Sequence, residues 1–144
     1  MDKTYNQIVS LIWSIADDIL RDVFLRGQYR DVILPMVVLR RLDALLEPTK
    51  EAVEEELQEQ RDAGLDIIDE DALKDITGLS YFNTSKWTLS RLKSHATDDN
   101  KILLDNFNEY LGGFSDNVKD VLKNFEYYAK AEKLANNDRL LSMI

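Results

Sequence analysis

Cysteine is absent from this 144-residue chain, and histidine occurs once, at His95. A disulfide and a thiolate metal site are therefore excluded, and the nucleophile and base pairs that need Cys or His are almost excluded. The chain also lacks the glycine-rich motifs that bind dinucleotides or the phosphates of nucleotides. We therefore assign it no catalytic residue, no cofactor of its own and no metal ligand.

Glycine and proline are scarce, with five and two residues, and alternating β-branched patterns are nearly absent. Helices are the simplest interpretation throughout, and the spacing of apolar residues supports them. We predict an all-α fold, a single compact domain of about six to eight helices with no sheet. The expected helices are 5–24, 31–46, 50–63, 69–76, 88–94, 99–111, 115–125 and 127–135.

The segment 31–46 is apolar around much of its circumference, a pattern typical of a central buried helix. Asp31 is placed to cap its first turn, where Pro35 is tolerated because backbone donors there lack partners. Arg40 and Arg41 must then point away from the core. Pro48 ends this helix, and Thr49 is placed to cap the next one.

The net charge of −9 is concentrated in one segment, because residues 51–75 hold eleven acidic and two basic side chains. Such a charge run is usually solvated, so we expect a peripheral helix at 50–63 rather than a metal site or a site for a basic partner. Residues 1–50 hold seven acidic and seven basic side chains. A basic face for nucleic acid can therefore still form there.

One local pattern invites a DNA-binding hypothesis. Residues 69–76, a turn at 77–79 and a following helix with Lys86, Arg91 and Lys93 imitate a helix-turn-helix. The intervening residues 80–85 are longer than the usual tight turn, and the acidic first helix would repel phosphates. Both features argue against this interpretation.

Targeting and membrane signals are also absent. Asp17 and Asp18 interrupt the first apolar stretch, which excludes a signal peptide, and no later run is long enough to span a bilayer. We expect a cytoplasmic protein with no membrane contact. The chain becomes apolar again as it reaches Ile144, which suggests that the natural polypeptide continues.

Several segments together resemble one family. They are Leu11–Asp17, Tyr29–Pro35, Val38–Lys50, Tyr81–Lys86 and, more loosely, Leu122–Glu126. The chain resembles the N-terminal helical domain of the methylation subunit of type I restriction-modification systems. In that family this domain precedes an adenine-N6 DNA methyltransferase domain that uses S-adenosylmethionine.

The resemblance also shows what this chain does not contain. The family's catalytic Asn-Pro-Pro-aromatic motif is missing, because neither Pro35 nor Pro48 has a proline neighbour. Residues 1–144 therefore correspond to the helical domain alone, and the catalytic domain with its S-adenosylmethionine would follow residue 144. The fragment itself should be inactive.

The resemblance implies a role in subunit assembly and in enclosing target DNA. The implied partners are double-stranded DNA, the specificity subunit, a second methylation subunit and the restriction subunit. Contacts to DNA should go to phosphates, because base recognition belongs to another subunit. The candidate residues are Arg26, Arg30, Arg40, Arg41, Lys86 and Lys93, and each arginine can equally form a surface ion pair.

Tyr29 and Trp87 are candidate interface anchors, although core packing is the more common role of such side chains. A charge at a helix end, rather than catalysis, is the expected role of His95. Two other functions remain open. One is a free-standing helical adaptor that binds protein and not DNA, and the other is an independent enzyme, which the scarcity of reactive residues disfavours.

Overall fold

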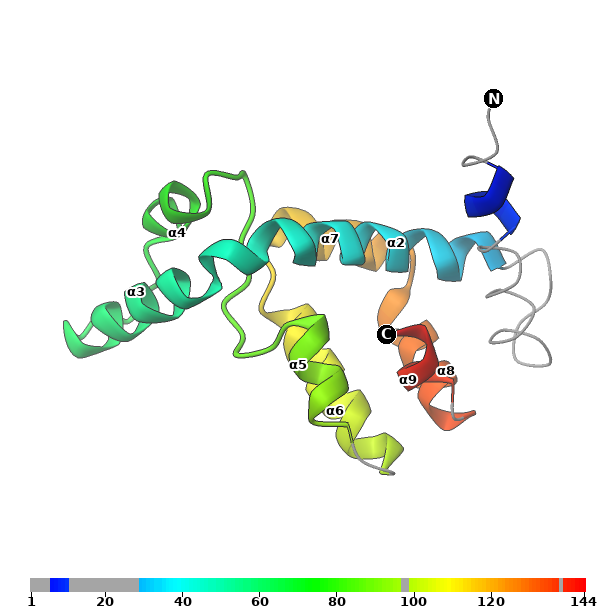
Figure 1. The fold of residues 1–144 in the computed structure, drawn as a ribbon. Helices are drawn as coiled ribbons and strands as arrows, with labels where there is room; N and C mark the ends of the chain where they lie inside the picture. Colours follow the sequence, from blue (N-terminus) through cyan, green and yellow to red (C-terminus); the bar gives the residue numbers. More distant parts are fainter. Residues whose placement is uncertain (1–5, 11–28, 97–98, 138) are drawn as a thin grey trace.

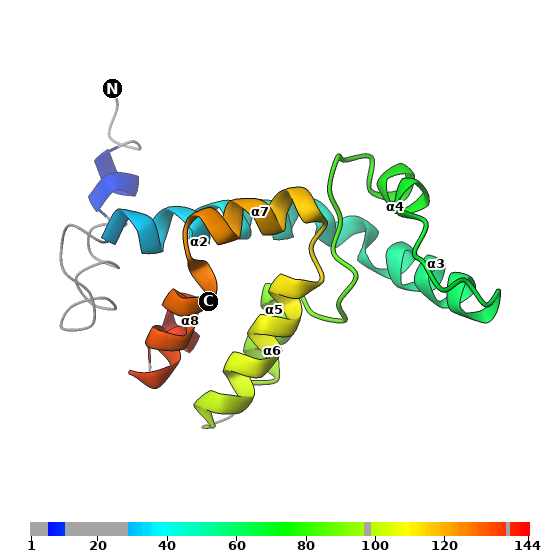
Figure 2. The same ribbon diagram turned by 180° about the vertical axis from the view of Figure 1, so that it is seen from behind.

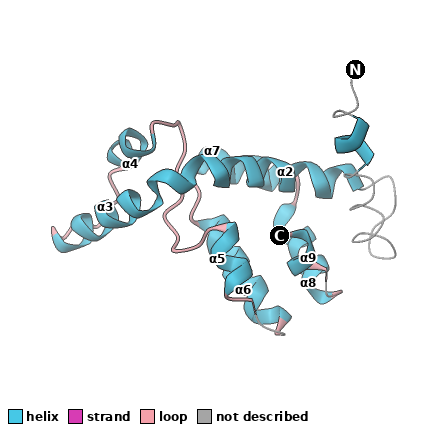
Figure 3. Ribbon diagram, in the orientation of Figure 1, coloured by secondary structure: helices cyan, strands magenta, loops and turns pink. Residues whose placement is uncertain are grey.

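The computed structural model describes residues 6–10, 29–96, 99–137 and 139–144, and helices dominate all of the longer ranges. The described part contains no strand, only an isolated bridge between Asn83 and Phe114, so the predicted all-α fold is confirmed (Figure 3). Most of the expected helix at 5–24, and Arg26, lie outside the described residues. The elements are α2 (Tyr29–Leu46), the 3-10 helix η3 (Glu47–Thr49), α3 (Lys50–Asp62), α4 (Glu70–Thr77), α5 (Leu89–Ser94), α6 (Asn100–Gly112), α7 (Asp116–Asn124), α8 (Tyr127–Asn136) and α9 (Leu140–Met143).

A long rod organises the molecule. Helices α2, η3 and α3 follow one another without an intervening loop, and Figure 1 shows them running across the whole width of the view. Helix α7 lies beside α2, while the pairs α5–α6 and α8–α9 extend from the same side of the rod (Figures 1 and 2). Helix α4 folds back onto α3, so residues 50–78 form a projecting arm. We call this segment the arm.

The main core lies beneath α2 and joins it to the later helices. Phe107, Tyr110 and Tyr127 are almost completely buried, and their rings pack edge-on or tilted at centroid distances of 6.1 and 6.4 Å. The helix expected at 99–111 supplies two of these rings. Burying side chains of this size contributes much of the favourable free energy of folding.

A second, smaller core holds the arm together. It consists of Val53 and Leu57 from α3, Leu73 from α4 and Phe82 from the following loop. The acidic side chains of α3 lie on the exposed or half-exposed faces, as expected for a peripheral helix. The arm is therefore stabilised separately from the main core, with Phe82 as one of its links to the rest of the chain.

Side-chain caps begin three of the predicted helices. Asp69, Thr88 and Asp99 each accept a hydrogen bond from a backbone N–H in the first turn of α4, α5 and α6. Thr49 differs from the prediction, because its hydroxyl donates to the carbonyl of Leu46 and makes no cap to α3. The preceding turn η3 places that carbonyl within reach of the threonine.

Helix α2 corrects two expectations. It already includes Tyr29, so Pro35 lies in its second turn and not in its first. Because Tyr29 is buried, the helix extends to the N-terminal side of Asp31. Pro35 removes only a single backbone hydrogen bond from the second turn. The helix is also less enclosed than a central helix, because four of its apolar side chains are 40–49 % exposed. They are Leu34, Val37, Val38 and Leu45.

The helix-turn-helix alternative does not match the packing. Helix α4 packs against α3 in the arm, whereas α5 packs against α6 in the main body. The two helices therefore belong to different cores and do not form one DNA-reading unit. None of the described helices has the length and hydropathy needed to cross a membrane.

Candidate functional site

A buried carboxylate fixes the orientation of α2. The buried side of this helix follows the spacing Val32, Met36, Leu39, Asp43 and Leu46, so one acidic residue occupies a position in an apolar stripe. The Asp43 carboxylate accepts hydrogen bonds from the backbone N–H of Leu89 at 3.1 Å and from the Tyr110 hydroxyl at 3.0 Å. These bonds join α2 to the start of α5 and to α6.

Tyr110 lies in the same buried environment as Asp43. Burial raises the pKa of Tyr110 well above its ordinary value, and the charge of Asp43 and the hydrogen bond to it raise that pKa further. The hydroxyl therefore stays protonated and remains a donor at physiological pH. Because this pair holds one face of α2 against the core, Arg40 and Arg41 extend from the exposed part of the same helix in fixed directions.

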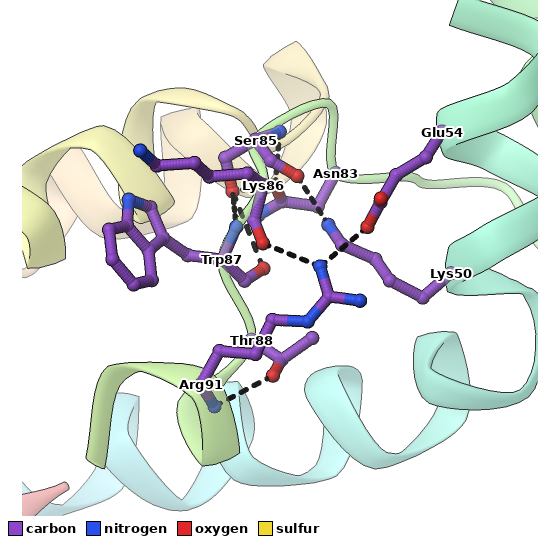
Figure 4. A network of polar contacts seen from close by, with 8 residues as sticks. All are labelled: Lys50, Glu54, Asn83, Ser85, Lys86, Trp87, Thr88 and Arg91. Carbon is purple, nitrogen blue, oxygen red and sulfur yellow. Dashed lines mark hydrogen bonds and ion pairs between the residues drawn. The ribbon is translucent and has the colours of Figure 1, made fainter. Parts of the chain in front are cut away.

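The loop after the arm is held by a set of polar contacts, drawn in Figure 4. The side-chain amide nitrogen of Asn83 donates to the carbonyl of Tyr110, and its oxygen accepts from both the backbone and the hydroxyl of Ser85. The hydroxyl of Ser85 in turn accepts from the N–H of Trp87. The loop thus lies directly against the end of α6.

Lys50 connects this loop to the arm. Its side chain is only 6 % exposed, and its Nζ donates to the carbonyl of Ser85 at 2.6 Å. Burial lowers the pKa of Lys50 to about 8, an effect that nearby Arg91 strengthens and the carboxylates of Glu54 and Asp43 oppose. A buried amine at this position therefore loses its proton far more readily than a surface lysine.

Arg91 forms the second connection between the arm and the main body. Its guanidinium forms an ion pair with Glu54 at 2.6 Å and donates to the carbonyl of Lys86 at 2.7 Å (Figure 4). Lys86 lies over the ring of Trp87, with its Nζ 5.0 Å from the ring centroid. These contacts fix the angle at which the arm leaves the main body.

Three of the predicted DNA-contact residues meet at one groove. Arg40 and Arg41 from α2 and Lys93 from α5 line a groove of about 560 Å3 and are exposed. None of the three makes an ion pair with another described residue. The rest of the lining is apolar, namely Ile33, Met36, Val37, Ala44, Met143 and Ile144. We call this the basic groove, and it presents free positive charge beside an apolar floor.

The remaining predicted residues lie elsewhere. Arg30 is exposed in the first turn of α2 and does not line the basic groove. Tyr29 and Trp87 are each 7 % exposed and belong to the main core. His95 follows the last turn of α5, where its Nδ1 lies 2.9 Å from the carbonyl of Arg91, and its ring contacts Trp87 edge-on.

Sequence reasoning missed the structural roles of Asp43, Lys50 and Arg91. A signal existed for Asp43, because it interrupts the regular stripe of buried residues on α2. Lys50 follows Pro48 at the start of a highly charged helix, and nothing in its neighbours indicates burial. Among the described residues no group of acidic or histidine side chains is arranged to hold a metal ion.

Comparison with known proteins identifies a family. The family model described as the HsdM N-terminal domain matches residues 8–144. No curated protein and no solved structure matches the chain. The matched residues include the arm, the basic groove and the main core, so the family comparison covers every feature described above.

Proposed function

The chain belongs to the HsdM N-terminal domain family and is the N-terminal part of a type I restriction-modification methylation subunit, and from this premise we propose that it helps the subunits assemble and encloses target DNA. Methyl transfer to adenine N6 and binding of S-adenosylmethionine belong, in this proposal, to a catalytic domain outside these residues. This chain contributes surfaces and no reacting group.

The basic groove is the observation that carries the DNA part of the proposal. Arg40, Arg41 and Lys93 come from two helices whose relative position is fixed by Asp43. Because each is exposed and lacks an ion pair among the residues described, its charge is available to a phosphate. Such contacts hold a duplex in position without reading its sequence.

The arm restricts how a duplex can approach. It carries almost all of the chain's excess negative charge, and its acidic side chains are exposed or half-exposed. Like charges repel strongly at low ionic strength, so phosphates avoid this end of the rod. A duplex that binds the basic groove therefore lies beside α2 and away from the arm.

The exposed face of α2 supports the assembly part of the proposal. Leu34, Val38 and Leu45 are 40–41 % exposed on a well-formed helix. These side chains share one side of α2 with the exposed Arg41 between Val38 and Leu45, and exposed apolar side chains grouped in this way are typical of protein interaction sites. We assign this face to another subunit of the complex, for which the specificity subunit, a second methylation subunit and the restriction subunit are the candidates.

Fluorescence anisotropy tests the DNA contact. The chain is titrated into a labelled duplex at several salt concentrations, beside an Arg40→Glu, Arg41→Glu variant. We expect weak, sequence-independent binding that decreases with salt and is lost in the variant. Lys101→Glu, Lys123→Glu is the matched control, since it makes the same change of charge at exposed positions outside the groove.

A protein-only adaptor is the second candidate, and the apolar face of α2 favours it as much as the first. It predicts no DNA binding by the unmodified chain even at low salt. Equal loss of binding in the groove variant and in the control would also count against a specific role for the basic groove. Thermal stability of each variant is measured first, so that unfolding is not mistaken for lost contact.

A further inference from the structure

The turn between α3 and α4 is unusually apolar for an exposed segment. In residues 63–69, which we call the arm tip, Ile67 is 85 % exposed, Leu65 is 52 % exposed and Ile68 is 44 % exposed. Asp66 and Asp69 lie among them and are exposed too. The arm tip therefore combines protruding apolar side chains with negative charge.

This exposure belongs to an ordered loop. Gly64 ends α3 with a φ of 75°, and the N–H of Leu65 bonds back to the carbonyl of Gln60. The buried side chain of Gln60 accepts from the N–H of Asp69 at 2.9 Å, and Asp69 caps α4. The loop is fixed at both ends, so Ile67 is held outward in a defined position.

The basic groove has the complementary chemistry. Its floor is apolar and its volume is about 560 Å3, large enough for several aliphatic side chains, while Arg40, Arg41 and Lys93 supply positive charge. The arm tip offers apolar side chains with Asp66 and Asp69 beside them. Apolar groups can therefore meet apolar groups while opposite charges pair around them.

The two surfaces cannot meet within one molecule. Helices α2, η3 and α3 form a continuous rod, and the arm projects beyond the end of α2 in both views (Figures 1 and 2). At a rise of about 1.5 Å per residue, the distance from Ala44 to Asp62 along this rod is roughly 27 Å. Lys50 and Arg91 hold the arm in that direction. Contact therefore requires two molecules.

We propose that a second copy of this chain inserts its arm tip into the basic groove. When two rods lie antiparallel and are related by a two-fold axis, each tip reaches the partner's groove, giving two equivalent contacts. The contact rests on the assembly part of the proposed function and deepens it, because it names a second copy of this chain as the partner. It uses the same groove as DNA, so the groove holds either the arm tip or a duplex at one time. Each contact is small and partly ionic, so the dimer is weak and sensitive to salt.

Sedimentation equilibrium of the 144-residue chain tests this contact. Measurements run from about 10 μM to about 1 mM, the range that resolves weak association. We expect concentration-dependent dimers at low salt and fewer at high salt. Ile67→Asp should raise the dissociation constant at least about tenfold, because it places a charged carboxylate against the apolar floor of the groove. Arg40→Glu with Arg41→Glu should have an effect of similar size, because it places glutamates against Asp66 and Asp69.

Matched controls separate this contact from general stickiness. Ile102→Asp changes another apolar side chain, 46 % exposed on α6, and Lys101→Glu with Lys123→Glu changes the same number of basic residues elsewhere. Both controls should dimerise like the original chain. All the substituted side chains are exposed, so circular dichroism and thermal melting should show folded proteins.

A mixing experiment gives the sharpest result. The Ile67→Asp variant keeps an intact groove and the Arg40→Glu, Arg41→Glu variant keeps an intact tip, so a mixture allows one contact that neither variant can make alone. We expect heterodimers in the mixture. A chain that stays monomeric throughout the concentration range, or dimers unaffected by either variant, would overturn the proposal. The DNA proposal is tested independently at protein concentrations well below the dissociation constant of the dimer, where Ile67→Asp should leave duplex binding unchanged.

Discussion

The carboxylate of Asp43 accepts a hydrogen bond from the hydroxyl of Tyr110 at 3.0 Å, although 67 residues separate them in the sequence. Both side chains are buried, with 7 % and 1 % exposure. The bond joins the helix that carries Arg40 and Arg41 to the centre of the main core. The position of the basic groove therefore depends on a polar contact inside the protein.

Replacing Tyr110 by phenylalanine tests the value of this bond. The change leaves Asp43 with one fewer donor, and hydrogen bonds to charged groups contribute about 1.5–3 kcal/mol, so we expect the free energy of unfolding to fall by that amount. Urea denaturation followed by circular dichroism gives the difference.

Tyr81→Phe is the control for that variant, because the buried hydroxyl of Tyr81 has no hydrogen-bond partner among the described residues. Its removal should leave stability unchanged or slightly increased, since no bond is lost. Equal destabilisation by the two substitutions would mean that the hydrogen bond from Tyr110 to Asp43 makes no special contribution to stability.

Gly113→Ala should destabilise the protein. A Cβ at this position would lie 2.5 Å from Oδ1 of Asn83 and 2.6 Å from the backbone nitrogen of Ser85, both of which are held by hydrogen bonds. We expect a loss of about 2 kcal/mol or more, as in other cases of overpacking. Differential scanning calorimetry measures the change in melting temperature.

The neighbouring glycine provides the comparison. A Cβ on Gly112 meets nothing within 4 Å, and this residue closes helix α6. Gly112→Ala should therefore be neutral or stabilising by up to about 1 kcal/mol, since alanine favours the helix. If both alanine variants had the same melting temperature, the inference that the 80–88 loop packs closely on the end of α6 would be wrong.

The lowered pKa of Lys50 predicts that the stability of the folded chain depends on pH. Its pKa falls from 10.5 to about 8 on folding, so between these values the unfolded chain binds more protons than the folded one. Stability must then rise with pH in this window. At about 1.4 kcal/mol per unit, the contribution of Lys50 should increase by about 2 kcal/mol between pH 8 and pH 10.

Comparison with Lys50→Met isolates this contribution. The variant keeps the apolar stem and removes the titrating amine, so the stability difference between the two proteins should change with pH as stated. Burial also raises the pKa of Tyr110 and Tyr127 above 10, and their contribution to stability decreases above that pH. The measurements therefore end at pH 10. A pH-independent difference would show that Lys50 titrates like an exposed lysine.

Local signals in the sequence predicted the helices well. Pro48 ends the apolar pattern, Gly64 takes a left-handed conformation after α3, and Thr88 caps α5, each for a reason visible within a few residues. The predicted start of α2 was wrong because Tyr29 is buried against distant parts of the chain, and local patterns do not reveal such contacts.

The candidate site was predicted only as separate residues. The sequence indicated that Arg40 and Arg41 point outward from one helix, and this is confirmed. That Lys93 joins them depends on the packing of α5, which Asp43 fixes through a bond to Leu89, 46 residues away. Such long-range contacts leave no periodic signal. The same limit explains why the burial of Lys50 was missed.

An NMR titration with a short duplex at low salt tests the central claim most directly. The 15N-labelled Ile67→Asp variant, in which the proposed dimer contact is weakened, is titrated, and the shifts of its backbone amides are followed. We predict the largest changes at Val37, Arg40, Arg41 and Lys93, with none in residues 62–71, because phosphates bind the basic groove and are repelled by the arm. Changes centred on the arm, or no changes at all, would contradict this account of the domain.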